Sequence, residues 1–225
     1  MFRPSALPLV EEWRQVINED RQGRWDQGEF NRLARDGWVV ADLLGGAPHG
    51  VWRAVCDEGR RLWPHMKAGF LESSEGKVTS GEAPSGAKRG DKHVFVSEAR
   101  RLPDEQAKGR GERAARGARG GAWPALEALD MALGVVGHAL GAAIEAHPRL
   151  RHPTRIRTDP KLACFPGASA AYGAHYDGGQ LGEACKLTSI LYCNEGWREA
   201  DGGRLHLLDE ANGCWRTVAP SAGRL

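Results

Sequence analysis

Apolar and polar positions in the first third of the chain follow a helical period with one interruption. Residues 8–19, 28–36 and 48–63 place apolar side chains three or four positions apart, as amphipathic helices do. Residues 37–44 instead form an apolar stretch with β-branched residues, which is typical of a strand. We therefore predict three helices in this region, with one strand before the third of them.

A longer apolar helix is predicted in the middle of the chain. Pro124 suits a first helical turn, and the pair His147-Pro148 marks the stop. Between them, apolar residues recur at steps of three and four, namely Leu126, Leu129, Leu133, Val136, Leu140 and Ile144. A helix with so broad an apolar face needs an equally broad partner, and a sheet is the natural one.

From residue 161 onward the pattern changes to that of short strands. Apolar segments are separated by Gly, Asn, Asp and Pro, and a similar segment occurs earlier at 93–96. The later predicted strands are 161–165, 186–193, 203–208 and 214–218. Helices followed by strands predict an α+β fold, with the helices packed on an antiparallel sandwich or jelly roll. We expect one domain over 37–225, preceded by a helical extension over 1–36.

Residues 99–121 depart from both patterns. They contain six Arg, one Lys and five Gly, and Leu102 is the one strong aliphatic residue among them. Such a composition is typical of a solvated, mobile loop. Arg/Gly tracts also bind RNA, but this one has no interleaved aromatic residues on which bases could stack. We therefore predict a mobile loop over 99–121.

Charge and cysteine content narrow the classes of partner and compartment. The 225 residues include 31 basic and 29 acidic ones, which gives no reason to expect nucleic acid or an anionic membrane as the partner. We see no secretory signal and no apolar run long enough to span a bilayer. The five cysteines form no C-x-x-C pair. They indicate reduced thiols in a cytoplasmic or nuclear protein, and they do not favour a zinc site.

The candidate chemistry lies in the stretch YGAHYDGG, residues 172–179. His175 and Asp177 are two positions apart, so on a strand both side chains point to the same face. One imidazole and one carboxylate are two of the three ligands of the 2-His-1-carboxylate site of non-haem Fe(II) oxygenases. A polar turn before a strand is the alternative interpretation of so short a motif.

The segments around this motif resemble the prolyl 4-hydroxylase branch of the Fe(II)/2-oxoglutarate-dependent dioxygenases. They are most similar to the prolyl hydroxylases that act on hypoxia-inducible factor. The similarity covers roughly residues 35–225 and is strong after 160; upstream it includes Arg89-Gly90-Asp91-Lys92. The matching residues are Cys164-Phe165-Pro166-Gly167, His175-Tyr176-Asp177, Thr188, Tyr192-Cys193-Asn194, Trp197 and Gly202-Gly203-Arg204-Leu205.

This resemblance implies a double-stranded β-helix, or jelly roll, with His175 and Asp177 as iron ligands. It also implies that the Tyr192 hydroxyl holds the distal carboxylate of 2-oxoglutarate. Strand parity agrees, because Thr188, Ile190 and Tyr192 fall on one face of the predicted strand. A core aromatic with its hydroxyl satisfied elsewhere is the alternative for Tyr192.

The remaining residues implied by the resemblance line the cofactor pocket and the substrate entrance. Phe165, Thr188 and Leu205 fall at cofactor-pocket positions. Phe165 stands where the family has a tyrosine, so it can line the pocket but cannot donate a hydrogen bond. Arg89 and Asp91 fall near the substrate entrance and are candidates for peptide contact. Solvated charge explains these two residues equally well, and an intracellular chain argues against an integrin-binding role for the Arg-Gly-Asp motif.

The function implied is hydroxylation of a peptidyl proline at C4, with Fe(II), 2-oxoglutarate and O2, and with L-ascorbate keeping the iron reduced. The substrate would be a proline-containing protein or peptide. Two alternatives stay open. The chain could be a non-catalytic peptide-binding module built on the same fold, or an oxygenase of another substrate such as a free amino acid or a nucleobase.

The last residues, VAPSAGRL, stop just after a turn signal, where a further strand is expected. In the resembling family a second histidine ligand and a basic anchor for 2-oxoglutarate lie beyond the matching GRL. His206 has the position of an ordinary sheet residue, so we do not assign it as a ligand. We expect a jelly roll incomplete at the C-terminus, and we predict that residues 1–225 alone bind Fe(II) weakly and turn over 2-oxoglutarate negligibly.

Overall fold

A computed structural model of the chain describes ten stretches of residues: 27–42, 50–73, 76–79, 90–102, 123–146, 148, 159–167, 170–175, 187–210 and 212–225. Its helices are α2 (Gln27–Asp36), α3 (Val51–Leu62), α4 (Val96–Ala99) and α5 (Pro124–Ala146), with short 3-10 turns η1 (Trp63–His65) and η2 (Glu199–Asp201). Its strands are β1 (Lys67–Ala68), β2 (Phe70–Ser73), β3 (Gly76–Thr79), β4 (Lys92–Phe95), β5 (Lys161–Cys164), β6 (Leu205–Asp209) and β7 (Cys214–Val218). The helix predicted over 8–19 lies outside these residues.

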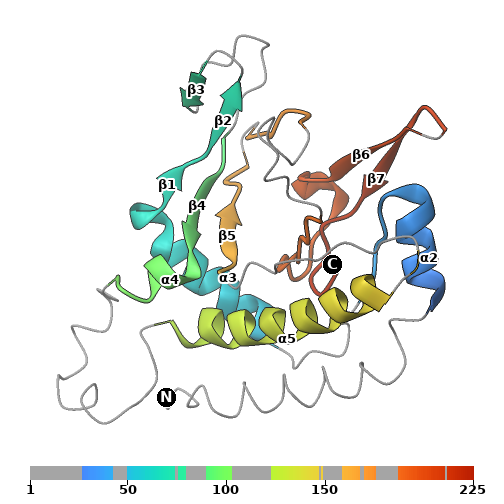
Figure 1. The fold of residues 1–225 in the computed structure, drawn as a ribbon. Helices are drawn as coiled ribbons and strands as arrows, with labels where there is room; N and C mark the ends of the chain where they lie inside the picture. Colours follow the sequence, from blue (N-terminus) through green and yellow to red (C-terminus); the bar gives the residue numbers. More distant parts are fainter. Residues whose placement is uncertain are drawn as a thin grey trace.

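The described strands form three small antiparallel sheets. The largest has the order β1-β4-β5, and the others are the pairs β2-β3 and β6-β7. Figure 1 shows α5 running beneath the sheet that contains β4 and β5, while β6 and β7 lie on the other side of the molecule. The predicted combination of helices and antiparallel strands is therefore present. A closed jelly roll is not seen among the described residues.

Helices α3 and α5 cover one face of the β4–β5 sheet. Leu62 from α3 and Leu126 from α5 join a buried cluster with Val94 of β4, and Leu162 and Cys164 of β5 pack against that cluster. The contact is close, since a Cβ built on Gly59 of α3 would lie 3.5 Å from the Cys164 Sγ. The prediction that the long apolar helix packs on a sheet is confirmed.

A buried carboxylate fixes where α5 begins. Glu58 of α3 is 4% exposed and accepts hydrogen bonds from the backbone N–H groups of Ala125 and Leu126, at 3.0 and 2.8 Å. These are among the N–H groups that a helix leaves unsatisfied in its first turn. The guanidinium of Arg61 lies 3.8 Å from Glu58 and stacks over the Trp123 ring. The start of α5 is therefore tied directly to α3.

Three distant segments meet in a short ladder at the end of the chain. Ala41 and Leu225 exchange two backbone hydrogen bonds, of 2.9 and 2.8 Å, and Asp42 forms a bridge with Arg224. On the other side, Tyr192 donates to the Arg224 carbonyl at 2.9 Å and accepts from the Gly223 N–H at 3.0 Å. The C-terminal residues thus lie between the segment before α3 and the segment that carries Tyr192.

Two predicted strands prove too long. In the stretch 37–44 only Ala41 and Asp42 pair with a neighbour, and residues 43–44 lie outside the described part. In the stretch 186–193 no regular strand forms over 187–193, although Tyr192 pairs with Gly223 and Arg224, and Asn194 bridges Ser221. The segment after β7 therefore pairs with residues from both stretches.

The prediction of a mobile loop over 99–121 is wrong for its first residues. Ala99 is the last residue of α4 and is 0% exposed, and Leu102 packs against the same buried cluster as Leu126. The prediction rested on the average composition of residues 99–121, which gave these two apolar residues little weight. Residues 103–121 lie outside the described part of the chain.

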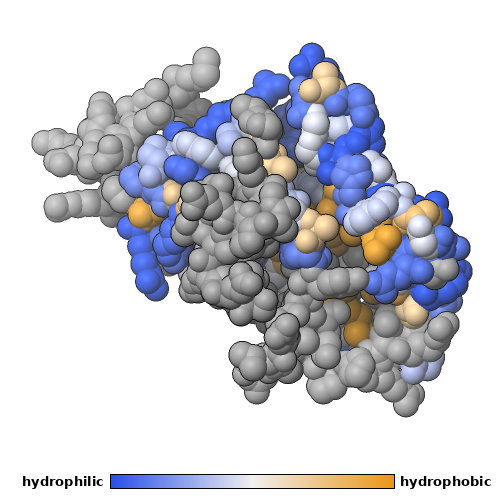
Figure 2. All heavy atoms as spheres, turned by 90° about the horizontal axis from the view of Figure 1, so that it is seen from above, coloured by the Kyte–Doolittle hydropathy of each residue, from blue (hydrophilic) through white to orange (hydrophobic). Residues whose placement is uncertain are grey.

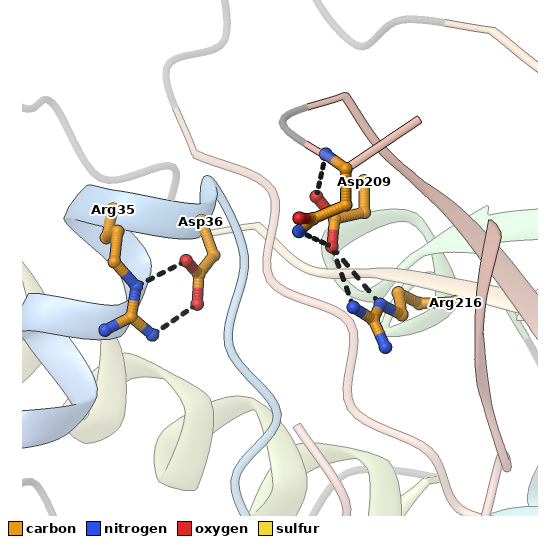
Figure 3. A network of polar contacts seen from close by, with 5 residues as sticks. Arg35, Asp36, Asp209 and Arg216 are labelled. Carbon is orange, nitrogen blue, oxygen red and sulfur yellow. Dashed lines mark hydrogen bonds and ion pairs between the residues drawn. The ribbon is translucent and has the colours of Figure 1, made fainter. Parts of the chain in front are cut away.

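The β6–β7 hairpin has one exposed and one partly covered face. Leu208 and Trp215 face each other across the strands and are 43% and 56% exposed. On the alternate positions, Asp209 is buried and binds the Arg216 guanidinium. Figure 3 shows this pair near the Arg35–Asp36 pair at the end of α2. The hydrogen bond from Arg35 lowers the pKa of Asp36, burial opposes this effect, and the positive charge of Arg216 adds to the lowering. Helix α2 therefore lies beside the hairpin.

Within the described residues, no helix, α5 included, is both long and apolar enough to cross a membrane.

Candidate functional site

The segment that carries His175 lies beside the beginning of β4. Strand β5 ends at Cys164, which pairs with Lys92. Pro166 and Gly167 then turn the chain away from the ladder, and Gly167 has a φ of 80°, which glycine adopts without strain. The chain returns at Ala171, whose carbonyl accepts a hydrogen bond from the Gly90 N–H at 3.1 Å. Residues 170–175 are called the His175 arm below.

Two contacts fix the orientation of the His175 ring. The ring stacks on Tyr172, with centroids 4.1 Å apart and planes 23° from parallel, and its Nδ1 lies 2.9 Å from the Gly173 carbonyl oxygen. When Nδ1 carries the proton and donates it to this carbonyl, the lone pair lies on Nε2. Metal-binding histidines are commonly oriented by such a hydrogen bond from the other ring nitrogen. The exposed imidazole of His175 therefore fits the part of a metal ligand.

The predicted partner of His175 cannot be placed, because Asp177 lies outside the described residues. Among the residues that the structure does describe, no group of three or more His, Cys, Asp or Glu side chains is arranged to hold a metal ion. His175 is among these described residues, and Asp177 is not. The metal pair thus stays a prediction, supported on the histidine side by the ring geometry.

Three partly buried cysteines lie next to two predicted cofactor residues. The Cys56 thiol of α3 donates to the Cys193 carbonyl at 3.1 Å, and the sulfurs of Cys164 and Cys193 lie close enough to influence each other. Burial raises the pKa of Cys164 to about 11 and that of Cys193 to about 12. Both thiols stay protonated at neutral pH and are poor nucleophiles. Their place against α3 makes them packing anchors.

Alternation along the chain predicts where Phe165 and Tyr192 point. Successive side chains of an extended chain point to opposite sides. Cys164, Leu191 and Cys193 pack against the helix clusters, as the predicted parity requires. The same alternation directs Phe165 and Tyr192 away from the helices, and this direction stays a prediction.

Tyr192 is suited to donate a hydrogen bond. Its ring is half-buried, and burial raises the pKa of the phenol above its ordinary value of 10.0. The hydroxyl therefore keeps its proton at neutral pH and can donate to a carboxylate.

The other predicted cofactor residues are more exposed or lie on another element. Thr188 is exposed, and Leu205 is half-buried on β6 opposite the buried Val218. His206 lies on the exposed face of β6, with its Nδ1 3.4 Å from the Thr217 hydroxyl. Leu205 and His206 therefore point to opposite sides of the hairpin, which agrees with leaving His206 out of the metal site.

The prediction that Asp91 contacts a peptide at the substrate entrance is not supported by its position. Asp91 is 1% exposed, and its carbonyl accepts a hydrogen bond from the Gly69 N–H at 2.9 Å. A side chain enclosed within the protein cannot reach a peptide on the surface. The sequence showed only a charged residue in a charged motif, which carries no information on burial. Arg89, the other predicted contact, lies outside the described residues.

Exposed apolar side chains occur on the segments around the site. Phe165 is 49% exposed, Tyr172 37% and Ile190 43%. On the face drawn in Figure 2, hydrophobic side chains of described residues form small patches among hydrophilic ones. Ligand pockets are mostly apolar with a few well-placed polar groups. Three exposed apolar residues on the site segments fit a surface that meets a ligand.

Sequence reasoning missed three contributors to this arrangement. Tyr172 stacks on His175, Gly90 binds the His175 arm, and Cys56 anchors the backbone beside Tyr192. The Cys56 contact joins residues 137 positions apart, so no local pattern could predict it. The sequence analysis assigned roles to the charged residues of the Arg-Gly-Asp motif and none to its glycine.

Residues 160–225 match the family model of the 2OG-Fe(II) oxygenase superfamily. A stretch of 78 residues is also 37% identical to the hypoxia-inducible factor prolyl hydroxylase of Caenorhabditis elegans. This second match covers 34% of the chain and 11% of the relative, so the chain spans about a tenth of that protein. The two partial matches together confirm the predicted similarity to the prolyl hydroxylase branch.

Proposed function

We propose that the chain forms part of an Fe(II)- and 2-oxoglutarate-dependent dioxygenase that hydroxylates a peptidyl proline, of the oxygen-sensing type. The observation that carries this proposal is the family match over residues 160–225, which contains His175-x-Asp177 and Tyr192 together. The partial similarity to a prolyl hydroxylase supports a proline-containing protein or peptide as the substrate.

In this proposal each site residue has a separate task. His175 and Asp177 hold the iron, with the His175 ring oriented by Tyr172 and by the Gly173 carbonyl. Tyr192 donates its hydroxyl proton to the distal carboxylate of 2-oxoglutarate. Bound Fe(II) supplies the oxygen chemistry, in which 2-oxoglutarate becomes succinate and CO2, one atom of O2 entering succinate and the other the substrate hydroxyl. Ascorbate would keep the metal reduced.

The residues that line the pocket decide how 2-oxoglutarate is held. Phe165 provides an apolar wall but no donor, so more of the carboxylate binding falls to Tyr192. The proposal also assigns Thr188 and Leu205 to the lining of the pocket. These groups shape the cavity and exclude water, which strengthens the hydrogen bond from Tyr192.

We further propose that the side of the sheet away from α3 is the interior of a jelly roll. The described sheets are antiparallel, and Cys164 and Cys193 pack against the helix clusters, so alternation along the chain would direct Phe165 and Tyr192 to the opposite side. The family model that matches residues 160–225 implies this architecture.

The substrate class is tested by a coupled assay on the protein as its natural gene encodes it, called the product of the natural reading frame below. Succinate formation from 2-oxoglutarate is measured with Fe(II), ascorbate and air, using a panel of proline peptides and the same peptides with alanine in place of proline. We expect proline peptides, and not their alanine forms, to stimulate succinate formation. Turnover that no proline peptide stimulates would refute the prolyl assignment and leave an oxygenase of another substrate.

A further inference from the structure

Gly90 lies in unusually close contact with the His175 arm. A Cβ built on Gly90 would come within 2.8 Å of both the Cα and the Cβ of Ala170. Real Cβ atoms essentially never approach another heavy atom closer than 3.0 Å. One of the two contacted atoms belongs to the backbone, so a side-chain rotation could not relieve the overlap. Any residue larger than glycine would therefore move one of the two chains.

The requirement at Gly90 is for space and not for an unusual backbone conformation. Its φ lies outside the left-handed region, whereas eight other described glycines have positive φ. The close approach coincides with the hydrogen bond from the Gly90 N–H to the Ala171 carbonyl. On the other side, the next residue accepts a hydrogen bond from Gly69, so β4 is held against β1 and has little freedom to yield. The arm is the more adjustable partner.

A displacement of the arm would reach the metal ligand. To restore ordinary contact at 3.4 Å, Ala170 would have to retreat by about 0.6 Å from a Cβ on Gly90. Metal sites tolerate ligand distances only within about 0.2 Å, and functional groups need placement within about 0.5 Å. A shift of this size five residues before His175 is therefore enough to disturb the site.

We infer that Gly90 is a positioning residue for His175, placing the arm so that the imidazole reaches the metal. This inference rests on the proposed function, because it takes His175 as an iron ligand. It gives the Arg-Gly-Asp motif a role that its charges did not suggest, since the glycine supports the metal site while Asp91 is buried.

The test uses the product of the natural reading frame in four forms: the parent, Gly90→Ala, Gly134→Ala, and Gly90→Ala combined with Ala170→Gly. Gly134 lies in α5, and a Cβ built on it meets nothing within 4 Å, so it is the matched control. The double variant removes one of the two contacted carbon atoms. Affinity for Mn2+ is measured by electron paramagnetic resonance, and thermal unfolding is measured on the same samples.

We expect Gly90→Ala to weaken Mn2+ binding about 10- to 100-fold while it still unfolds cooperatively. Gly134→Ala should bind as the parent does, and the double variant should recover part of the lost affinity. Parent-like Mn2+ affinity in Gly90→Ala would overturn the inference. If Gly90→Ala does not fold, the Mn2+ affinity of the double variant is compared with that of the parent instead. The double variant keeps one of the two close contacts, so parent-like affinity in it would overturn the inference.

A second readout separates this inference from the proposed function. In the metal-free protein, backbone amide shifts at 171–175 should change in Gly90→Ala and stay unchanged in Gly134→Ala. Unchanged shifts at the His175 arm would overturn the positioning role whatever the metal affinity. A parent that binds no Mn2+ would instead refute the proposed metal site, even if the arm shifts as expected.

Discussion

Tyr192 shows at the scale of one residue how packing prepares a site. Its backbone N–H and carbonyl are both bonded to the C-terminal segment at Arg224 and Gly223, and its neighbour Cys193 is anchored on α3. The side chain is half-buried, and burial raises the pKa of its hydroxyl, which keeps its proton at neutral pH. The same environment would suit a plain core aromatic, so a change confined to the hydroxyl is needed to separate the two roles.

Tyr192→Phe removes that hydroxyl alone. A hydrogen bond to a charged group contributes about 1.5–3 kcal/mol. The apparent KM for 2-oxoglutarate should therefore rise about 10- to 150-fold. Affinity for Mn2+ in the absence of 2-oxoglutarate should hardly change, which serves as the internal control. An unchanged KM would assign Tyr192 to the hydrophobic core and leave the carboxylate anchor to another residue.

At the scale of elements, the joint between α3 and α5 holds the helix layer under the sheet. Glu58 satisfies two N–H groups at the start of α5, and Arg61 lies against both Glu58 and Trp123. Since Trp123 and Leu126 belong to the cluster that packs on β4 and β5, this joint sets the position of the sheet that carries Cys164.

Glu58→Ala should destabilise the fold strongly for a single change. It leaves two buried N–H groups without their acceptor, which we expect to lower the free energy of unfolding by about 3 kcal/mol. Glu58→Gln keeps one acceptor oxygen and should lie between the parent and Glu58→Ala. Asp57→Ala is the matched control on α3, because its ion pair with Arg60 is exposed and contributes at most about 1 kcal/mol. Urea unfolding measures the free energy of unfolding of the parent and the three variants. Equal decreases for Glu58→Ala and Asp57→Ala would contradict this account of the joint.

The elements that the sequence predicted best are those fixed by local chemistry. Helix α5 begins at Pro124 and ends at Ala146, as the proline and the His-Pro stop indicated, and β7 covers the predicted 214–218. The described residues of the stretches 37–44 and 186–193 form no regular strand, although both pair with the segment after β7, because strand formation depends on partners that are distant in the chain. The hairpin of β2 and β3, with β1 before it, was not predicted, since these strands are two to four residues long.

The same distinction applies to the site. The family resemblance predicted roles for His175, Tyr192 and Phe165, and packing shows how the neighbouring residues Cys164 and Cys193 are held against the helices. Burial of Asp91 and the contact at Gly90 depend on neighbours that are far apart in the chain. No periodicity in the sequence encodes them.

At the scale of the whole molecule, one ion pair joins the N-terminal part of the described chain to its last residues. The Arg224 guanidinium donates to both carboxylate oxygens of Asp42, at 2.9 and 3.2 Å. The hydrogen bond from Arg224 lowers the pKa of Asp42 below its ordinary value of 3.8. This pair reinforces the ladder that also holds Tyr192.

The contribution of this pair should depend on pH in a defined direction. A carboxyl group whose pKa is lowered by folding stabilises the protein fully above its ordinary pKa, and loses this effect as pH falls through the lowered one. A double-mutant cycle of Asp42→Asn and Arg224→Gln should give a coupling of about 0.2–1 kcal/mol at pH 7, since Asp42 is largely exposed. The coupling should vanish below the folded pKa of Asp42. A coupling that grows on acidification would contradict the assignment.

The central claim is that His175 and Asp177 hold the iron of a 2-oxoglutarate-dependent oxygenase. Succinate formation with Fe(II) and air tests it most directly, in the product of the natural reading frame and in its His175→Ala and Asp177→Ala variants, with Thr217→Ala on the exposed face of β7 as control. We expect turnover by the parent and the control, and a loss of at least about 100-fold in both ligand variants. No succinate from the parent, or parent-like turnover by Asp177→Ala, would contradict the claim.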